Sequence, residues 1–271
     1  MNIPIEDTFT DIIGKAQRGL GLDDQALADR AGVGVAQVQA LKDGTLDEAV
    51  LGKVAGVLAL GAELLLAQAQ GRYTPAAVPP IDGLAFANTV FEDMTVNAYV
   101  VWDPVSREAA FFDTGADGDP LLEVAGRENL KVTQILLTHT HGDHILDLDR
   151  LKEKTGARAF VGDKEPLDGA ESFAAGRTFS IGGLRVETRL TWGHSPGGIT
   201  YFISGLSVPV AIVGDSMFAG SMGGGAVSYA EALRNNREQI LTLPDETVLC
   251  PGHGPLTTVA EQKRVNPFFA V

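Results

Sequence analysis

The stretch from His139 to His144 constrains the fold of this chain more than any other part of the sequence. It reads His-Thr-His-Gly-Asp-His and places three histidines and one aspartate within six residues. The apolar run Ile135–Leu137 directly before it is typical of a buried strand. Imidazole and carboxylate groups at the end of a strand are ligand types for zinc, iron or manganese. The stretch therefore predicts a metal site, the alternative being a polar loop before a helix predicted at Ile145–Thr155.

The distribution of histidine favours metal binding over the polar loop. The chain has five histidines, and three of them lie in this stretch. The other two, His194 and His253, lie in the glycine- and proline-rich turns Gly-His-Ser-Pro-Gly-Gly and Pro-Gly-His-Gly, of the kind that ends strands. No histidine is left over for a structural role.

Four motifs in a fixed order resemble the metallo-β-lactamase fold superfamily. They are His-x-His-x-Asp-His, Gly-His-Ser-Pro-Gly, Gly-Asp-Ser-Met-Phe and Pro-Gly-His-Gly, and the resemblance covers roughly Ile81 to Val271. The resemblance implies a mixed α/β (α+β) fold class, the αββα sandwich, in which two sheets pack face to face with helices outside. Short predicted strands separated by turns and helices follow one another in this part of the chain, as such a sandwich requires.

The resemblance also implies seven ligands for two divalent metal ions. The first ion would be bound by His139, His141 and His194, and the second by Asp143, His144 and His253. Asp215, which ends the apolar strand predicted at Val208–Val213, would bridge the two ions. Zinc is the expected metal, with iron or manganese as alternatives.

The catalytic roles follow from the same resemblance. A water held between two such ions has a pKa lowered to about 7, so that hydroxide can act as the nucleophile on a carbonyl. Asp143 and Asp215 are therefore expected to be catalytic residues as well as ligands. Asp113, in Asp-Thr-Gly, resembles an early aspartate of the family that supports the metal-binding loops; the alternative is a turn-forming aspartate.

Within the superfamily, the chain most resembles short bacterial proteins similar to glyoxalase II, the hydroxyacylglutathione hydrolase. The resemblance lies in Gly-Asp-Ser-Met-Phe-Ala-Gly-Ser at 214–221 and in Leu-Pro-Asp-Glu-Thr-Val-Leu-Cys-Pro-Gly-His-Gly at 243–254. It implies a metal-dependent hydrolase of a thioester or activated ester, and recognition of glutathione would be inferred from kinship alone.

Two other functions stay open. In an enzyme that resembles persulfide dioxygenases, His139, His194 and Asp215 would bind a single iron as two imidazoles and one carboxylate. In a transcriptional regulator, the metal domain would sense a metabolite and the N-terminal segment would bind DNA. Metal content distinguishes the first alternative from a dinuclear hydrolase, and retention on DNA at physiological salt tests the second.

The N-terminal segment, residues 1–72, is expected to form a small all-α bundle. Residues 22–44 resemble a helix-turn-helix of the phage-repressor type, in which Asp23 caps the first helix and Gly32 takes the left-handed turn. Residues 1–72 contain six basic and ten acidic side chains, and the presumed recognition helix, Ala36–Leu41, contains no basic residue. We therefore expect these helices to mediate homodimerisation or to cover the active site, and not to bind nucleic acid.

A proline-rich linker is predicted at residues 73–80, so the catalytic domain would comprise residues 81–271. The net charge of -14 argues further against a nucleic-acid substrate. The first residues lack the pattern of a secretory signal, and no apolar run reaches the length of a membrane span. With one cysteine, Cys250, the chain forms no internal disulfide, so a cytoplasmic location is expected.

Overall fold

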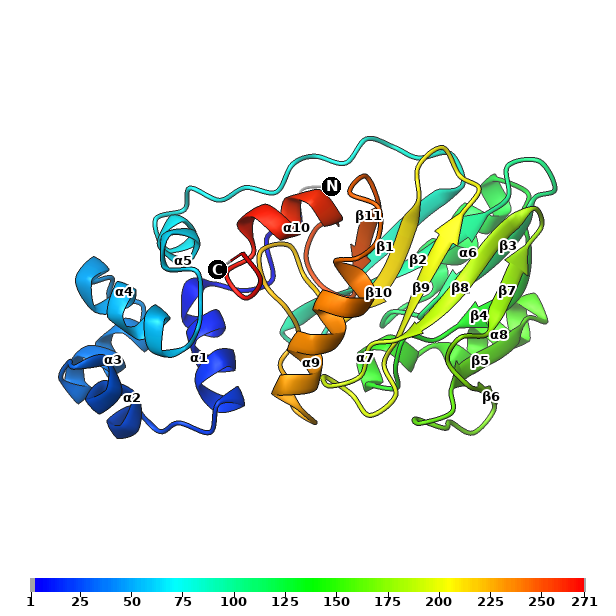
Figure 1. The fold of residues 1–271 in the computed structure, drawn as a ribbon. Helices are drawn as coiled ribbons and strands as arrows, with labels where there is room; N and C mark the ends of the chain where they lie inside the picture. The colour runs from blue at the N-terminus through cyan, green and yellow to red at the C-terminus, as the bar shows by residue number, and fades with distance from the viewer. Residues whose placement is uncertain (1–2, 271) are drawn as a thin grey trace.

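The computed structural model describes residues 3–270, and two six-stranded sheets form its larger part (Figure 1). The first sheet contains, in spatial order, β1 (Leu84–Phe91), β2 (Met94–Trp102), β3 (Glu108–Phe112), β4 (Lys131–Leu136), β5 (Arg158–Gly162) and β6 (Glu171–Phe173). The second sheet contains, in spatial order, β12 (Thr257–Thr258), β11 (Val248–Pro251), β10 (Val210–Gly214), β9 (Ile199–Ser204), β8 (Leu184–Leu190) and β7 (Thr178–Ile181).

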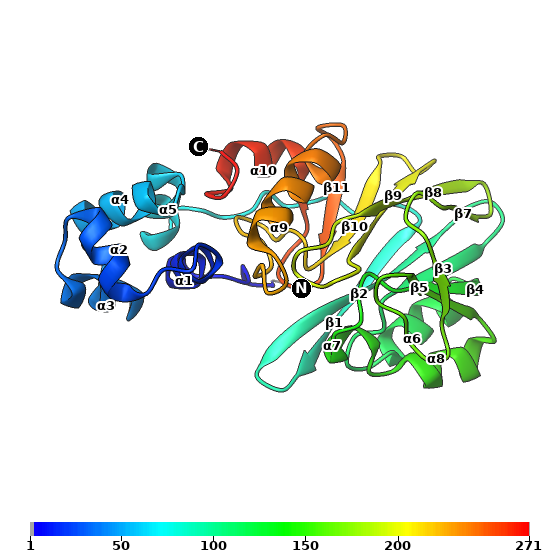
Figure 2. The same cartoon turned by 60° about the horizontal axis from the view of Figure 1, so that its bottom comes forward.

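Helices cover the outer face of each sheet (Figure 2). Against the first sheet lie α6 (Asp119–Arg127), α7 (Gly142–Ile145) and α8 (Leu148–Thr155). Against the second lie α9 (Tyr229–Asn235), which continues into the π-helical turn η1 (Asn236–Ile240), and α10 (Val259–Val265). The four layers confirm the αββα fold class that the sequence predicts.

The alternation of side chains along the central strands explains why the sheets stack in this way. In β2, Tyr99 and Val101 point into the core between the sheets, whereas Val100 and Trp102 pack under the helices of the first sheet. β10 alternates in the same manner between the inner core and the helices of the second sheet. Both faces of these strands are buried, so their sequences are almost continuously apolar. Cys250, in β11, belongs to the inner core as a small buried hydrophobe.

The region around the helix predicted at Ile145–Thr155 differs from that prediction. The chain forms two helices, because α7 begins at Gly142 and Asp147, the second of the two residues between α7 and α8, leaves the helical conformation. The Asp147 carboxylate accepts hydrogen bonds from the backbone of Gly118 (2.7 Å) and from Arg150 (2.8 Å). These contacts draw Asp147 out of a continuous helix and place Asp143 and His144 in a separate short one.

The N-terminal part of the described chain is helical. It contains α1 (Phe9–Gly19), α2 (Asp24–Ala31), α3 (Val35–Lys42), α4 (Glu48–Val57) and α5 (Ala62–Ala69). Asp23 caps α2 by accepting from the backbone of Ala26 (2.7 Å), and Gly32 follows α2 with a φ of 63°. The sequence predicts both of these local features. No helix among residues 3–270 is long and apolar enough to cross a membrane.

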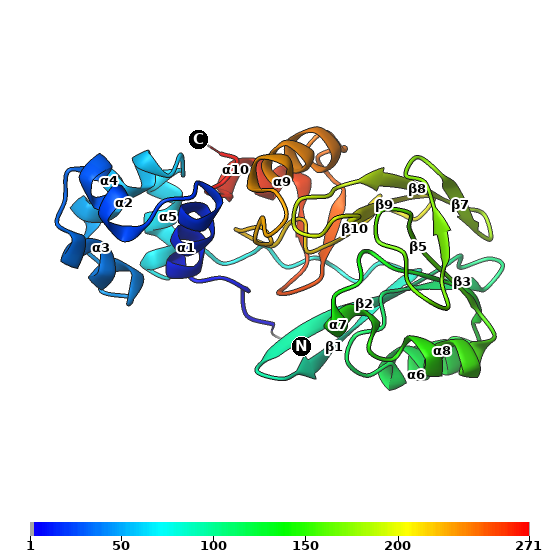
Figure 3. The ribbon, with the colours of Figure 1, turned by 90° about the horizontal axis from the view of Figure 1, so that it is seen from below.

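The helical core is shared with the C-terminal half of the chain. Met222 and Tyr229 pack into it, as does Phe268 near the C-terminus. Figures 1 and 3 show α9 and α10 between the N-terminal helices and the two sheets. The helices end at Ala69 and the first strand begins at Leu84, while the division into domains at 72 and 80 stays a prediction.

Candidate metal centre

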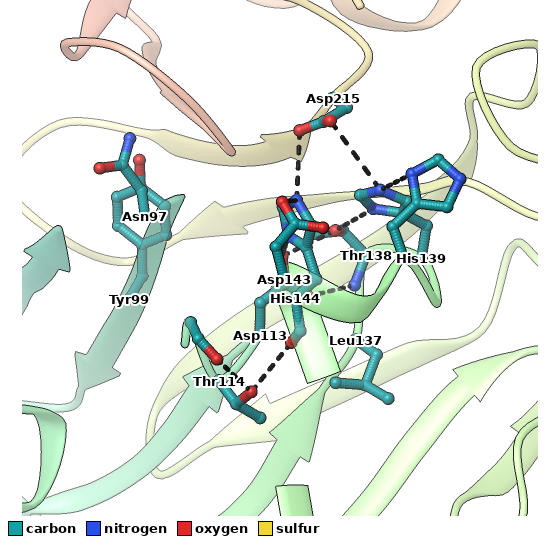
Figure 4. Close-up of polar contacts among 12 residues, drawn as sticks. Asn97, Tyr99, Asp113, Thr114, Leu137, Thr138, His139, Asp143, His144 and Asp215 are labelled. Atoms are coloured by element: carbon teal, nitrogen blue, oxygen red, sulfur yellow. Dashed lines mark hydrogen bonds and ion pairs between the residues drawn. The ribbon is translucent and has the colours of Figure 1, made fainter. Parts of the chain in front are cut away.

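The predicted ligands converge at one end of the sandwich, where several strands end. β4 leads into the loop that contains His139 and His141, and α7 follows it directly. β10 and β11 run parallel, so Asp215 and His253, which follow them, emerge at the same edge of the second sheet. His194 comes from the connection between β8 and β9. Figure 4 shows Asp215 facing the side chains of the 139–144 loop from the opposite sheet.

One group of side chains consists of His139, His141, His194 and Asp215, each of which offers a ligand atom within 4.8 Å of the others. His141 Nδ1 lies 3.1 Å from His139 Nε2 and 3.0 Å from His194 Nε2. Asp215 Oδ2 lies 3.4 Å from His194 Nε2 and 4.0 Å from His139 Nε2. His139 and Asp215 are buried, whereas His141 reaches the surface.

A second group, Asp143, His144 and His253, is buried and equally close. Asp143 Oδ2 lies 3.4 Å from His144 Nε2 and 3.3 Å from His253 Nε2. Asp215 also reaches this group, because its Oδ1 is 3.4 Å from His144 Nε2 and its Oδ2 is 3.4 Å from His253 Nε2. The structure thus brings all seven predicted ligands together, while metal binding by each of them stays a prediction.

The residues fit a bound cation. A tetrahedral zinc site with ligands about 2.0–2.1 Å from the ion separates those ligands by roughly 3.4 Å. Several of the nitrogen and oxygen pairs in both groups have this spacing. Among the described residues, His144 Nε2 and Asp215 Oδ1 are buried without a hydrogen-bond partner. Such atoms are rare in folded proteins, and a cation between them would satisfy both.

Hydrogen bonds on the far side of the imidazole rings fix their orientation. His144 Nδ1 donates to Asp113 Oδ2 (2.8 Å), and His253 Nδ1 donates to the carbonyl of Thr95 (2.7 Å). His194 Nδ1 donates likewise to the carbonyl of Gly224 (2.9 Å). Because Nδ1 makes this outer hydrogen bond, Nε2 is the nitrogen that faces the site in each ring, as in histidine ligands of metals.

Asp113 connects the first sheet to the 139–144 loop. Its carboxylate accepts from the backbone and the hydroxyl of Thr138, both at 2.7 Å, as well as from His144 (Figure 4). The hydroxyl of Thr138 in turn accepts from His139 Nδ1 (3.0 Å). Asp113 has a φ of 57°, so it also turns the chain at the end of β3. The two interpretations of this residue that the sequence leaves open coincide.

Glu165 is a site residue that the sequence does not reveal. It is 9% exposed, and its carboxylate accepts four hydrogen bonds. One oxygen accepts from the backbone (3.1 Å) and hydroxyl (2.8 Å) of Thr140, and the other from the hydroxyl of Ser195 (2.8 Å) and the backbone of Gly197 (2.9 Å). Glu165 therefore joins the loop of His139 and His141 to the loop of His194.

Gly252 allows the second sheet to approach the ligands. A Cβ atom at this position would lie 2.1 Å from Asp215 Oδ1 and 2.6 Å from His144 Cε1. No side chain fits at such distances, so only glycine lets β11 lead directly into His253. The requirement explains the glycine before the histidine in Pro-Gly-His-Gly.

Charge in the site favours a cation. Burial alone lowers the pKa of His144, but the carboxylates of Asp215 and Asp113 outweigh this effect and raise the pKa to about 10. Burial likewise opposes protonation of His253, and the carboxylates of Asp215 and Asp143 raise its pKa to about 11. Without an ion, the aspartates therefore hold protons on both imidazoles. A divalent cation would replace those protons.

Two imidazoles of the first group, those of His139 and His194, have lowered pKa values. Burial lowers the pKa of His139 well below its usual range, and the nearby His144 lowers it further. Burial also lowers the pKa of His194. Both side chains are therefore neutral at pH 7 and present a free lone pair, the form in which histidine binds a metal.

Comparison with known proteins assigns the fold to a family. Residues 92–253 match the metallo-beta-lactamase superfamily. The chain belongs to this superfamily. It is 31% identical to the probable metallo-hydrolase YqgX of Bacillus subtilis over 187 residues, covering 59% of this chain and 87% of that protein. It is 26% identical to the hydroxyacylglutathione hydrolase GloC of Haemophilus influenzae over 197 residues, 64% of this chain and 92% of that protein.

A solved structure gives the same assignment. The crystal structure of the BLEG-1 B3 metallo-beta-lactamase aligns with a TM-score of 0.60 and 27% identity, covering 69% of this chain and the whole of that one. The family and the grouped histidines and aspartates together imply that metal ions bind at this site.

Proposed function

We propose that the protein is a dinuclear metal-dependent hydrolase of thioesters or activated esters, with zinc as the expected metal. The proposal rests chiefly on Asp215. One of its carboxylate oxygens lies 3.4 Å from His194 in the first group and 3.4 Å from His253 in the second. A carboxylate within reach of both groups is suited to bridge two ions, as the resemblance implies.

Each ligand residue has a definite task in such a centre. Two divalent ions would act as Lewis acids and lower the pKa of a shared water to about 7. Asp143 and Asp215 would supply negative charge that balances the ions, and the histidines would hold the ions through a ring nitrogen, Nε2 or Nδ1. His144 and His253 are oriented by Asp113 and by the Thr95 carbonyl. No histidine is left to act as a general base.

Kinship supports the proposed substrate class. Both of the relatives described above are named as hydrolases, and one of them carries the name hydroxyacylglutathione hydrolase. The carbon attacked in a thioester or ester is a carbonyl carbon, and two cations beside it would stabilise the oxyanion that develops. The chain has no alternative nucleophile of the thiol class, because Cys250 lies in the core between the sheets.

A single-iron centre would use His139, His194 and Asp215. The second group would then have no ligand role, although His144 Nε2 is buried there without a partner among the described residues. Three buried side chains arranged within 4.8 Å of one another favour a second ion. We therefore rank the dinuclear hydrolase above the persulfide dioxygenase.

The metal content of protein purified without added metal or chelator tests the proposal. We expect close to two ions per chain, together with hydrolysis of at least one member of a panel of glutathione thioesters, other thioesters and activated esters. Hydrolysis of a β-lactam and of no member of this panel would overturn the proposed substrate class. One iron per chain, with oxygen uptake in the presence of a persulfide, would overturn the whole proposal. If only thioesters of glutathione are hydrolysed, the result would support a substrate of the kind that the name of GloC states.

A further inference from the structure

The segment that follows Asp215 lies between the metal ligands and the N-terminal helices. Met222 and Tyr229, within this segment, pack into the core of the N-terminal helices. The loop 216–225, which belongs to the same segment, also contacts the candidate ligands. Figure 3 shows this part of the chain between α1 and the end of β10.

Three ligands are in contact with the loop 216–225. The carbonyl of Gly224 accepts from His194 Nδ1 at 2.9 Å and so orients that ring. A Cβ at Gly223 would lie 1.9 Å from the backbone oxygen of Asp215, so the loop packs directly against the backbone of Asp215. The ring of Phe218 meets the ring of His253 edge on, with centroids 5.7 Å apart. A displacement of this loop would therefore change the positions of ligands in both groups.

The N-terminal region contacts the loop through a buried ion pair, and also through Gln68 on α5, whose side-chain amide donates to the carbonyl of Gly220 at 2.7 Å. Lys15, on α1, pairs with Asp7 at 2.5 Å and donates to the backbone carbonyl of Met222 at 3.0 Å. Asp7 also accepts from the hydroxyl of Ser221 at 2.5 Å. The ammonium group of Lys15 lies 5.0 Å from the centre of the Phe218 ring. The side chains of Lys15 and Asp7 are 15% and 7% exposed, so water screens this pair weakly.

We propose that Lys15 and Asp7 are positioning residues for the metal centre. They belong to the N-terminal region and hold the loop 216–225 in the conformation in which the Gly224 carbonyl orients His194 and the Phe218 ring packs on His253. The inference rests on the metal site of the proposed function and is independent of the substrate. It assigns the N-terminal helices a role in supporting the ligands.

The contacts also explain why both members of the pair are needed. Without Asp7, the Ser221 hydroxyl would lose its acceptor. Without Lys15, Asp7 would be a buried carboxylate with no cation beside it. Together they form hydrogen bonds to two successive residues of the loop, Ser221 and Met222. Outer-shell contacts of this kind tune the affinity of a site by keeping ligands in one orientation.

The test compares Lys15→Met with Lys53→Met, a matched change at an exposed lysine on α4. The readouts are metal affinity, measured on the full chain by competition with a chelator, the visible spectrum of the cobalt-substituted protein, and Tm. We expect Lys15→Met to weaken metal binding about 10-fold and to change the cobalt spectrum. Lys15→Arg should restore most of the affinity, and Lys53→Met should match the wild type.

A second variant distinguishes weaker metal binding from a general folding defect. Asp7→Asn combined with Lys15→Met removes both charges, so no unpaired charge stays buried. Weaker metal binding and an altered cobalt spectrum in this double variant, at a Tm near that of the wild type, would support the positioning role. A lower Tm with unchanged metal affinity and spectrum would show that the pair only stabilises the fold and would overturn the inference. None of the three readouts uses a substrate, so the result of this test does not depend on the outcome of the hydrolysis assay.

Discussion

Replacement of Glu165 by glutamine tests whether the two ligand loops depend on one carboxylate. Glu165 accepts two hydrogen bonds on each oxygen, from Thr140 on one side and from Ser195 and Gly197 on the other. Glutamine keeps one oxygen and presents an amide NH2 group in place of the second. The hydroxyl of Thr140 or Ser195 can turn and accept from that group, but a backbone N–H cannot. One buried N–H is therefore left unpaired in either orientation of the amide.

The unpaired N–H determines how much stability the Glu165→Gln protein should lose. An unpaired buried donor destabilises a protein by about 1–3 kcal/mol. For a chain of this size that loss corresponds to a fall in Tm of roughly 3–10 °C. Because the same side chain joins the loops of His139 and His194, metal affinity should also fall, by about 10-fold to 100-fold.

Thermal unfolding and chelator competition measure both effects on the same sample. Glu171→Gln is the matched control, since Glu171 lies on β6 and pairs on the surface with Arg158 and Arg177. We expect the control to keep the Tm and the metal affinity of the wild type, because exposed ion pairs contribute little. A Glu165→Gln protein that melts and binds metal like the wild type would refute the assignment of Glu165 as the link between the loops.

Two further predictions concern the metal centre itself. Asp215→Asn should lower metal content and hydrolytic activity together, because Asp215 lies within 3.4 Å of ligand atoms in both groups; a fully metallated and active variant would contradict the bridging role. Addition of zinc to metal-free protein at pH 7.5 should release protons, detectable with a pH indicator, because this pH lies below the raised pKa values of His144 and His253, about 10 and about 11. No proton release would show that these imidazoles are neutral before the metal binds.

The sequence predicts much of the site because the histidines are few and lie in four recognisable motifs. All five histidines, with Asp143 and Asp215, come together as expected. The almost continuous apolar sequences of β2 and β10 are likewise typical of strands that are buried on both faces, as the structure shows them to be. These signals are local, since each can be recognised within a window of about ten residues.

The missed features depend on contacts between distant segments. Glu165 lies in a short polar turn after β5, and its role arises only when the turn meets Ser195, thirty residues later. The pairing of Lys15 with Met222 joins residues 207 positions apart. The interruption at Asp147 similarly depends on the backbone of Gly118. Propensity and periodicity cannot reveal such partners.

The candidate ligands come from both sheets, and this division has a consequence for the dynamics of the enzyme. His139, His141, Asp143 and His144 follow strand β4 of the first sheet, whereas His194, Asp215 and His253 follow strands of the second. Bound ions would therefore act as a cross-link between the two halves of the sandwich. Any motion that separates the sheets would then have to break bonds to metal first, so the rate at which those bonds break would set an upper limit on how often the sandwich opens.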